Sequence, residues 1–354
     1  MNSQKCSAKQ ISFTLKKGEK TMQDKIVLKK NARQRLELTT SDLQLLLFLE
    51  QQRMLTLQQF YQAAKHLLEM KITEYSFKNR IRKFEEYHLI RGDHYSEGFN
   101  GERFKFLCIG SKAVDLLIEN KLLDISYNKS KIYKFNQKKN LMHFLATQQA
   151  AINILTSLNA ELIRDPVTDE IKYSILYNLT SFSHSPATFP YTEWIRKHKN
   201  LHRQNSGAYH ARVSKYMTGN KTSTEINGTT IMIVKPDWII KLKGSKKIRD
   251  AIINIELDMG TEPYETLAQK VFRYAILADK NPDVLHIMDI VIADNSFSNR
   301  STLSSGIKRA ENIMKQFVSD SAIANRVKQS GLKLIVSPLK QNDQFIFDAL
   351  SESD

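Results

Sequence analysis

The spacing of apolar residues divides the chain into a mainly helical first part and a second part that mixes strands with helices. From residue 38 onward, apolar positions return every three or four residues, and turn residues separate the runs. The pattern predicts helices at 40–49, 56–68 and 73–87, two strands at 89–91 and 103–109, and a helix at 111–119. This order of elements is typical of a winged helix-turn-helix, which we place at 37–122.

The second part predicts an α/β domain over 138–354. Its expected elements are a long helix at 139–158, strands near 161–164, 171–179, 237–242, 251–257, 284–293 and 332–336, and helices beginning at Pro263 and Ser305. At about 184–224 the periodicity lapses, and basic residues alternate with aromatic ones. That composition suits a groove for single-stranded DNA, but a surface insertion would have it too. The predicted class is α+β overall.

The charge balance indicates a polyanionic partner. Among 354 residues, 53 Lys and Arg stand against 37 Asp and Glu, and a net charge of +16 is not needed for folding. No run approaches the ~20 apolar residues of a membrane span, and the charged N-terminus lacks an apolar signal core. Two cysteines are too few for a disulfide framework. We therefore expect a cytoplasmic protein that binds nucleic acid and no membrane.

The third predicted helix has one apolar and one basic face. Phe77, Ile81 and Phe84 share the apolar face. The residues predicted to contact duplex DNA are Lys78, Asn79, Arg82 and Lys83 on this helix and Arg91, Arg103 and Lys105 on the hairpin. The alternative is an ordinary solvated face. Residues 1–36 form a basic arm that could neutralise phosphates or be a solvated tail, and 123–137 has the composition of a linker.

Acidic residues stand where buried strands should stay apolar. Asp237 begins one Ile-rich strand, and Glu256 and Asp258 end the next. Because Glu256 and Asp258 are two residues apart, they point to the same face of the sheet. Three converging carboxylates repel one another unless a cation lies between them, and oxygen ligands suit Mg²⁺ or Mn²⁺. Solvated strand ends or helix caps would explain the same residues without a metal.

The helix that follows favours the metal site. Leu267, Val271 and Tyr274 mark its apolar face, and Lys270 lies beside that face, one turn from Leu267 and from Tyr274. From there the Lys270 ammonium could reach the strand ends and act on a phosphate.

These motifs together resemble a known nuclease pattern. Pro236-Asp237, the run E-L-D-M-G-T-E from Glu256 and the run A-Q-K-V-F-R-Y from Ala268 are similar to the PD-(D/E)xK superfamily. More narrowly, they resemble the replication-relaxation proteins and MobC-type relaxases, which join a winged helix to such a domain. By this resemblance Asp237, Glu256 and Asp258 would be metal ligands. Asp258 occupies the place of the family's usual lysine, so either Lys270 has taken over that role or the site does not cut DNA.

Two functions follow from the resemblance. The first is a site-specific, metal-dependent DNA-nicking endonuclease, a relaxase that starts transfer or replication of a plasmid or other mobile element. The second is a non-catalytic winged-helix accessory or replication-relaxation protein with a degenerate nuclease-like domain. Expected partners are double-stranded DNA, single-stranded DNA at a nick, and other mobilisation or replication proteins. No phosphate-binding loop of the G-x-x-x-x-G-K-[ST] type is present, which argues against an ATP-driven helicase.

Overall fold

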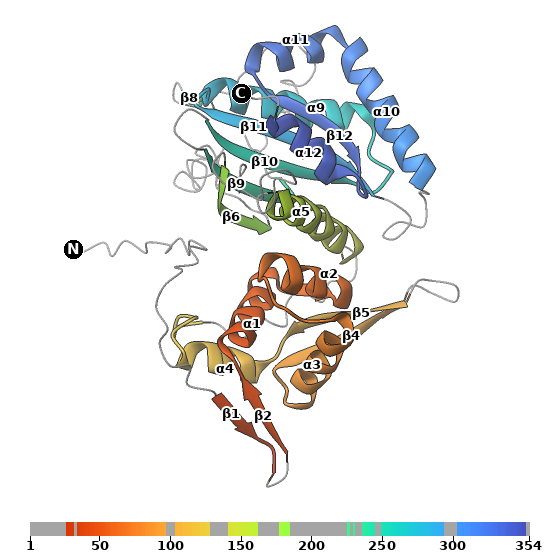
Figure 1. Ribbon diagram of the computed structural model, residues 1–354. Helices are drawn as coiled ribbons and strands as arrows, with labels where there is room; N and C mark the ends of the chain where they lie inside the picture. The colour runs from red at the N-terminus through yellow and green to blue at the C-terminus, as the bar shows by residue number, and fades with distance from the viewer. Residues whose placement is uncertain are drawn as a thin grey trace, which may run out of the picture.

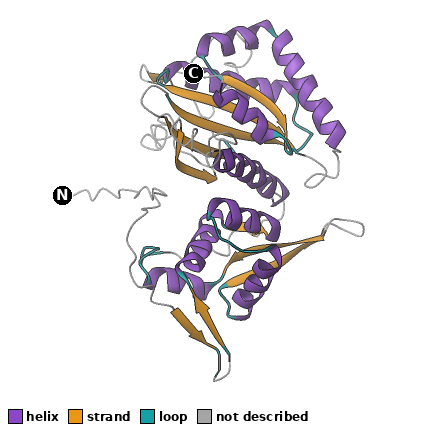
Figure 2. Ribbon diagram, viewed as in Figure 1, coloured by secondary structure: helices purple, strands orange, loops and turns teal. Residues whose placement is uncertain are grey.

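The computed structural model describes residues 26–31, 34–96, 103–127, 141–161, 177–184, 225–226, 229–230, 236–244, 249–293 and 303–351. In these residues the chain is a mixed α+β protein, as predicted. A largely helical N-terminal part with small sheets precedes a larger sheet covered by helices (Figure 1 and Figure 2). The predicted basic insertion lies almost entirely outside the described residues.

The N-terminal part contains the predicted helices and hairpin. Its elements are α1 (Thr40–Gln52), β3 (Met54–Thr56), α2 (Leu57–Gln62), the π-helix η1 (Ala63–Leu67), α3 (Glu74–Glu86), β4 (Ile90–Ser96), β5 (Arg103–Ile109) and α4 (Ser111–Glu119). The short strand β3 was not predicted, and it makes a three-stranded sheet of order β3-β5-β4. A capping box opens α2, because Thr56 and Gln59 each accept the other's backbone N–H.

A hairpin precedes these elements, in the stretch where the sequence predicted only a basic arm. Strand β1 (Ile26–Lys29) pairs antiparallel with β2 (Arg35–Leu38). Leu36 and Leu38 alternate with exposed residues and are buried in the N-terminal core. Aromatic residues fill much of that core, and the rings of Phe60 and Phe77 meet edge to face at 5.5 Å.

The larger sheet has five strands in the order β12-β11-β10-β9-β6. They are β6 (Tyr177–His184), β9 (Trp238–Gly244), β10 (Asp250–Asp258), β11 (Val284–Ile292) and β12 (Lys333–Pro338). Strands β10, β11 and β12 are parallel, whereas β9 pairs antiparallel with both β10 and β6. The central strands are almost fully buried because helices cover both faces, which explains their continuous apolar runs. A further two-stranded pair joins β7 (Glu225–Ile226) and β8 (Thr229–Thr230).

Two layers of helices enclose the five-stranded sheet (Figure 1). The helices are α5 (Leu141–Glu161) and α12 (Asn342–Ser351) on one face, and α9 (Tyr264–Lys280), α10 (Leu303–Ser319) and α11 (Ser321–Ser330) on the other. Helices α11 and α12 were not predicted. A strand was predicted near 161–164. Residue 161 is the last residue of α5, and residues 162–164 lie outside the described residues. No helix in the described ranges is long and apolar enough to cross a membrane.

Helix α5 belongs to both parts of the molecule. Leu141 and Leu145 pack with Met54, Phe106 and Cys108 of the N-terminal part, while other residues of α5 pack on the five-stranded sheet. The Gln59 side chain donates to the Leu145 carbonyl at 2.7 Å. The Gln148 side chain donates to the Gln52 carbonyl at 2.8 Å, and both bonds are buried. Buried polar bonds of this kind fix one register of packing between the two parts.

Candidate active site

Asp237 and Glu256 lie side by side on neighbouring strands. The Asp237 backbone N–H donates to the Ile255 carbonyl at 3.0 Å, so Asp237 extends the β9–β10 ladder by one residue. Its carboxylate Oδ2 accepts the Leu257 N–H at 2.9 Å. The Asp237 carboxylate therefore lies beside β10, next to Glu256. Its negative charge adds to the effect of burial in raising the pKa of Glu256.

Glu256 is a buried carboxylate, with 4% of the residue exposed. Its Oε1 accepts the Tyr274 hydroxyl at 2.7 Å, and its Oε2 lies 3.0 Å from Lys270 Nζ. Burial raises the pKa of Glu256 to about 7, and the nearby Lys270 ammonium only partly opposes this effect. A further cation beside Glu256 would therefore favour its charged form.

Lys270 reaches the strand end from α9, as the helical spacing predicted. Its ammonium is shared between Glu256 and Glu262, whose Oε1 lies 2.9 Å away. Burial disfavours the charged form of Lys270, but the two carboxylates outweigh it and raise the lysine pKa. The ammonium thus stays protonated beside the carboxylates.

Asp258 has a different environment from Glu256. Its Oδ1 accepts three backbone N–H groups, those of Gly260, Thr261 and Glu262, at 2.8, 3.0 and 3.1 Å. Its Oδ2 binds the Arg309 guanidinium of α10 through Nε and Nη2, both at 2.6 Å. Arg309 Nη2 also donates to the Glu262 carbonyl at 2.7 Å. Asp258 thus holds the turn between β10 and α9, in which Gly260 adopts a φ of 86°.

The carboxylates therefore differ in how well they fit a divalent cation. Asp237 and Glu256 adjoin each other and offer oxygen ligands, whereas both oxygens of Asp258 are already used by the turn and by Arg309. Across the described residues, no group of three or more His, Cys, Asp and Glu side chains is placed to share a metal ion. The predicted ligand set of three stays a prediction, and the geometry favours Asp237 and Glu256 over Asp258.

His143 adjoins the site, although a lone histidine on the predicted long helix was interpreted from the sequence as a packed or surface residue and not as a catalyst. It lies on α5, and its Nε2 is 3.4 Å from Asp237 Oδ2. A lone histidine on an amphipathic helix gives no sequence signal, because the contact joins residues far apart in the chain. Besides the Lys270 ammonium, the site thus has an imidazole next to Asp237 that can accept or donate a proton.

The predicted DNA-binding residues lie on the exposed face of α3 and on the β4–β5 hairpin. Lys78 and Lys83 are exposed and Asn79 is half-buried, while Phe77, Ile81 and Phe84 are buried as predicted. Arg103 is the first residue of β5, and its side chain lies outside the described part. Tyr75, with 76% of the residue exposed, shares the polar face of α3 and was missed. Its spacing of three and four from Lys78 and Asn79 was the available signal.

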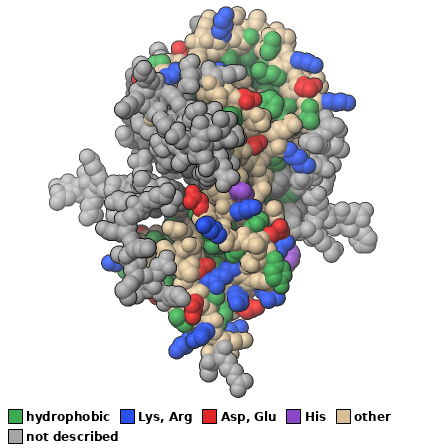
Figure 3. All heavy atoms as spheres, in the orientation of Figure 1, with side chains coloured by type: hydrophobic (Ala, Val, Ile, Leu, Met, Phe, Trp, Pro, Cys, Tyr) green, Lys and Arg blue, Asp and Glu red, His purple; other side chains and the backbone are tan. Residues whose placement is uncertain are grey.

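Four of these cations already have acidic partners. The pairs are Lys78 with Glu74 at 2.6 Å, Arg82 with Glu86 at 3.8 Å, Arg91 with Asp93 at 3.1 Å and Lys105 with Glu85 at 2.6 Å. Exposed pairs of this type contribute about 0–1 kcal/mol each, so phosphates can replace the carboxylates at little cost. Figure 3 shows Lys and Arg side chains spread over the N-terminal part, interspersed with acidic ones.

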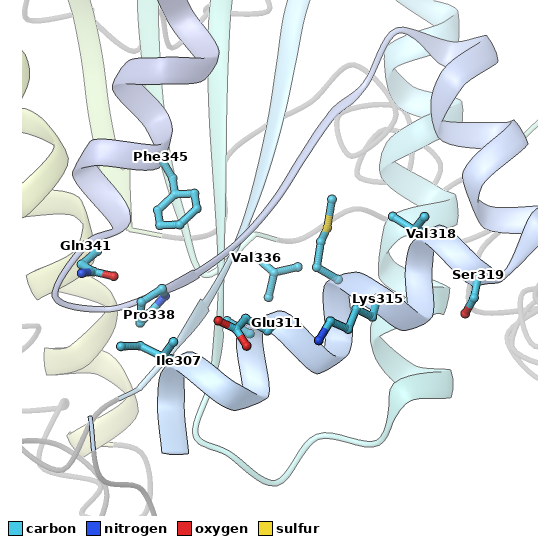
Figure 4. A pocket seen from close by; sticks show the side chains of 11 residues that line it. Ile307, Glu311, Lys315, Val318, Ser319, Val336, Pro338, Gln341 and Phe345 are labelled. Carbon is cyan, nitrogen blue, oxygen red and sulfur yellow. The ribbon is translucent and has the colours of Figure 1, made fainter. Parts of the chain in front are cut away.

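An apolar groove lies elsewhere on the surface, between α10, β12 and the start of α12 (Figure 4). Its volume is about 610 Å³, and Ile307, Met314, Val318, Val336 and Phe345 supply most of its apolar lining. Among the described residues that line it, Glu311 and Lys315 are the charged ones. The groove contains none of the predicted site residues.

Comparison with protein families places these features in context. A family model described as replication-relaxation matches residues 46–284, from within α1 to the first residue of β11. The match includes α3, the carboxylates of β9 and β10, and Lys270. No curated protein and no solved structure matches the chain. Since the matched region is more than half of the 354 residues, the chain belongs to the replication-relaxation family.

Proposed function

We propose that this protein binds double-stranded DNA and nicks it, in the replication or mobilisation of a plasmid or other mobile element. Membership of the replication-relaxation family supports the biological role. The observation that carries the nicking activity is the position of Lys270, whose Nζ lies 3.0 Å from Glu256 Oε2 and comes from α9 instead of from the strand. In this proposal, Lys270 of α9 supplies the positive charge that a lysine on the strand supplies in the PD-(D/E)xK pattern.

DNA binding is assigned to a winged helix-turn-helix formed by α1 to α4 with the β4–β5 hairpin as the wing. The exposed face of α3 would enter the major groove, and the wing cations would contact neighbouring phosphates. The high net charge supports this assignment, since sequence-independent phosphate contacts supply much of the affinity of such proteins.

The nicking site is assigned to Asp237, Glu256 and Lys270. Asp237 and Glu256 would hold Mg²⁺ or Mn²⁺, which supplies Lewis acidity and charge neutralisation at a scissile phosphate. Lys270, released from Glu256 once that carboxylate has another cation, would direct its ammonium at the phosphate and stabilise the charge that develops there. Asp258 and Arg309 would hold the turn that places α9, and with it Lys270, against the strand end.

A nicking assay tests this proposal. Supercoiled plasmid carrying the DNA that neighbours this gene would be incubated with the protein, with and without Mg²⁺ or Mn²⁺, and open circles would be quantified. Asp237→Ala and Glu256→Gln should abolish metal-dependent nicking and leave duplex binding intact, because neither residue contacts DNA in the proposal. Glu265→Gln, an exposed acid on α9, is the matched control and should nick like the parent.

A binding function without catalysis is the second candidate. It is favoured by the partners that Glu256 and Asp258 already have, namely Lys270, Tyr274 and Arg309, which leave both acids charge-compensated. If the parent protein binds plasmid DNA but opens no circles with either metal, this candidate replaces the nuclease.

A further inference from the structure

The β1–β2 hairpin is a defined ribbon with a fixed base. Along β2 the residues alternate between buried and exposed, and Leu36 and Leu38 are 2% and 1% exposed in the N-terminal core. Ile26 and Leu28 of β1 pack against the same core. The base of the ribbon is thus held by apolar burial, and its far end extends away from the core (Figure 1).

At the far end of the ribbon, hydrogen bonds join Lys30 and Asn31 to Gln34. The Lys30 N–H donates to the Gln34 carbonyl at 3.0 Å. The Asn31 side chain accepts the Gln34 N–H at 2.8 Å and donates to the Gln34 side chain at 2.9 Å. An asparagine that bonds its neighbours in this way is typical of an ordered turn.

The same end concentrates positive charge. Lys29 lies directly opposite Arg35 in the strand register, and Lys30 follows at the turn. All three are exposed, and within the described ranges none has an acidic partner. Like charges directly opposite each other destabilise a strand pair. This end therefore differs from α3, where Lys78 and Arg82 each have a glutamate.

The ribbon is tied to α3 by a single arginine. Arg80 of α3 donates to the Glu37 carbonyl of β2 at 2.6 Å and to Asp42 Oδ1 of α1 at 3.0 Å. Asp42 is 3% exposed and also takes part in the capping box with Thr39. A bidentate pair between a partly buried arginine and a buried carboxylate favours one geometry. The ribbon and the exposed face of α3 are therefore held at a fixed distance from each other.

We propose that the β1–β2 ribbon is a second DNA-contacting element, in which Lys29, Lys30 and Arg35 bind phosphates of the same duplex that α3 contacts. A duplex backbone supplies the negative charge that the Lys29–Arg35 pair lacks, so binding relieves the repulsion in the ribbon. The link through Arg80 makes the two contacts act on adjoining segments of one duplex. This inference rests on the proposed DNA binding by α3.

The test compares two charge-removal variants of the full chain on one probe. The probe is a fluorescently labelled duplex of about 40 base pairs and mixed sequence, titrated from low to physiological salt. Lys29→Gln with Lys30→Gln and Arg35→Gln removes three phosphate contacts, so the slope of log K against log salt should fall by about 2.7. The matched control, Lys308→Gln with Lys315→Gln and Lys328→Gln, removes three exposed charges from α10 and α11 and should change the slope by less than about 0.5.

Further variants separate this inference from the proposed function. Lys29→Arg with Lys30→Arg keeps the charge and should bind like the parent. If Lys78→Ala with Arg82→Ala weakens binding but the ribbon variant equals the control, the ribbon does not contact DNA and the inference fails, while binding by α3 stands. If neither variant weakens binding, both proposals fail. If the parent binds vesicles of anionic lipid as tightly as the duplex through the same three residues, the ribbon is a general anion contact and the inference is also overturned.

Discussion

Glu256 and Asp258 are two residues apart on one strand, point to the same face, and are both buried, but their surroundings differ in kind. Asp258 is satisfied by three backbone N–H groups of the turn that follows it and by the Arg309 guanidinium. Glu256 is satisfied by the side chains of Lys270 and Tyr274, and its pKa is raised to about 7 by burial. A carboxylate bound by the backbone of a turn has a structural role, whereas one bound by a lysine side chain can take a new ligand when that side chain changes its rotamer. Two acidic residues that are equivalent in the sequence pattern thus have separable roles.

The largest expected effect is on stability, and it separates the two acids directly. Asp258→Ala should lower the free energy of unfolding by about 3 kcal/mol or more, because Arg309 and three N–H groups lose their acceptor. Glu256→Gln should change it by about 1 kcal/mol or less, since the amide still accepts the Tyr274 hydroxyl and Lys270 keeps Glu262. Urea denaturation at pH 7 measures both.

Asp258→Asn is the control within this comparison. The amide oxygen can still accept the three N–H groups, so the loss should be smaller than that of Asp258→Ala and should reflect Arg309 alone. Equal losses for Asp258→Ala and Glu256→Gln would contradict the structural role of Asp258.

The second prediction concerns nicking activity and tests whether Lys270, the partner of Glu256, takes part in catalysis. Lys270→Ala should reduce metal-dependent nicking by about 10²-fold, the scale of losing one donor to the transition-state charge. Lys270→Arg should recover only part of the rate, because a planar guanidinium does not replace a point charge. Initial rates of circle opening, with duplex binding measured in parallel, separate catalysis from affinity. A Lys270→Ala variant that nicks at the parental rate would remove Lys270 from the site.

Asp258→Lys is a further test of the assignment of Lys270 to the site. It restores the residue usual at this position in the nuclease pattern but removes the acceptor for the turn. We expect an unstable protein without nicking activity. Full activity of Asp258→Lys, together with a harmless Lys270→Ala, would refute the assignment of the helix lysine.

Local patterns in the sequence predicted most of the secondary structure. The Ile-rich runs gave strands β9 and β10, and the S/T-x-x-Q signature at Thr56 gave the start of α2. Helices α11 and α12 were not predicted, although Asp320 caps the start of α11 and Gly331 ends it in the left-handed conformation. The β1–β2 ribbon was not predicted, because its alternation of apolar residues is short and lies within a stretch rich in Lys and Arg.

The candidate site was predictable only in part, for a physical reason. Lys270 could be placed because its reach depends on one helix and the strand just before it. Arg309 and His143 could not be placed, because each meets its carboxylate across a long stretch of chain through packing of α10 and α5 on the sheet. The role of Asp258 had a local signal, since an acid followed by Gly260 and Pro263 before a helix is typical of a turn acceptor.

A further prediction concerns a third buried carboxylate, Asp289 on β11, beside which the described part of the chain places no cation. Its Oδ1 accepts the Ser337 hydroxyl at 2.7 Å, and burial raises its pKa to about 7 from an ordinary value of 3.8. Since the folded pKa is the higher one, the stabilising contribution is complete below about pH 4 and is lost as the pH rises to about 7. Asp289→Asn imitates the protonated acid, so the stability of the variant relative to the parent should rise by about 4 kcal/mol between pH 4 and pH 8. Urea denaturation at several pH values measures this difference, and Asp348→Asn, an exposed acid on α12, should show no such trend. If Asp289→Asn tracks the parent at every pH, burial alone does not raise a carboxylate pKa in this sheet, and the raised pKa of Glu256 would need a cause other than desolvation.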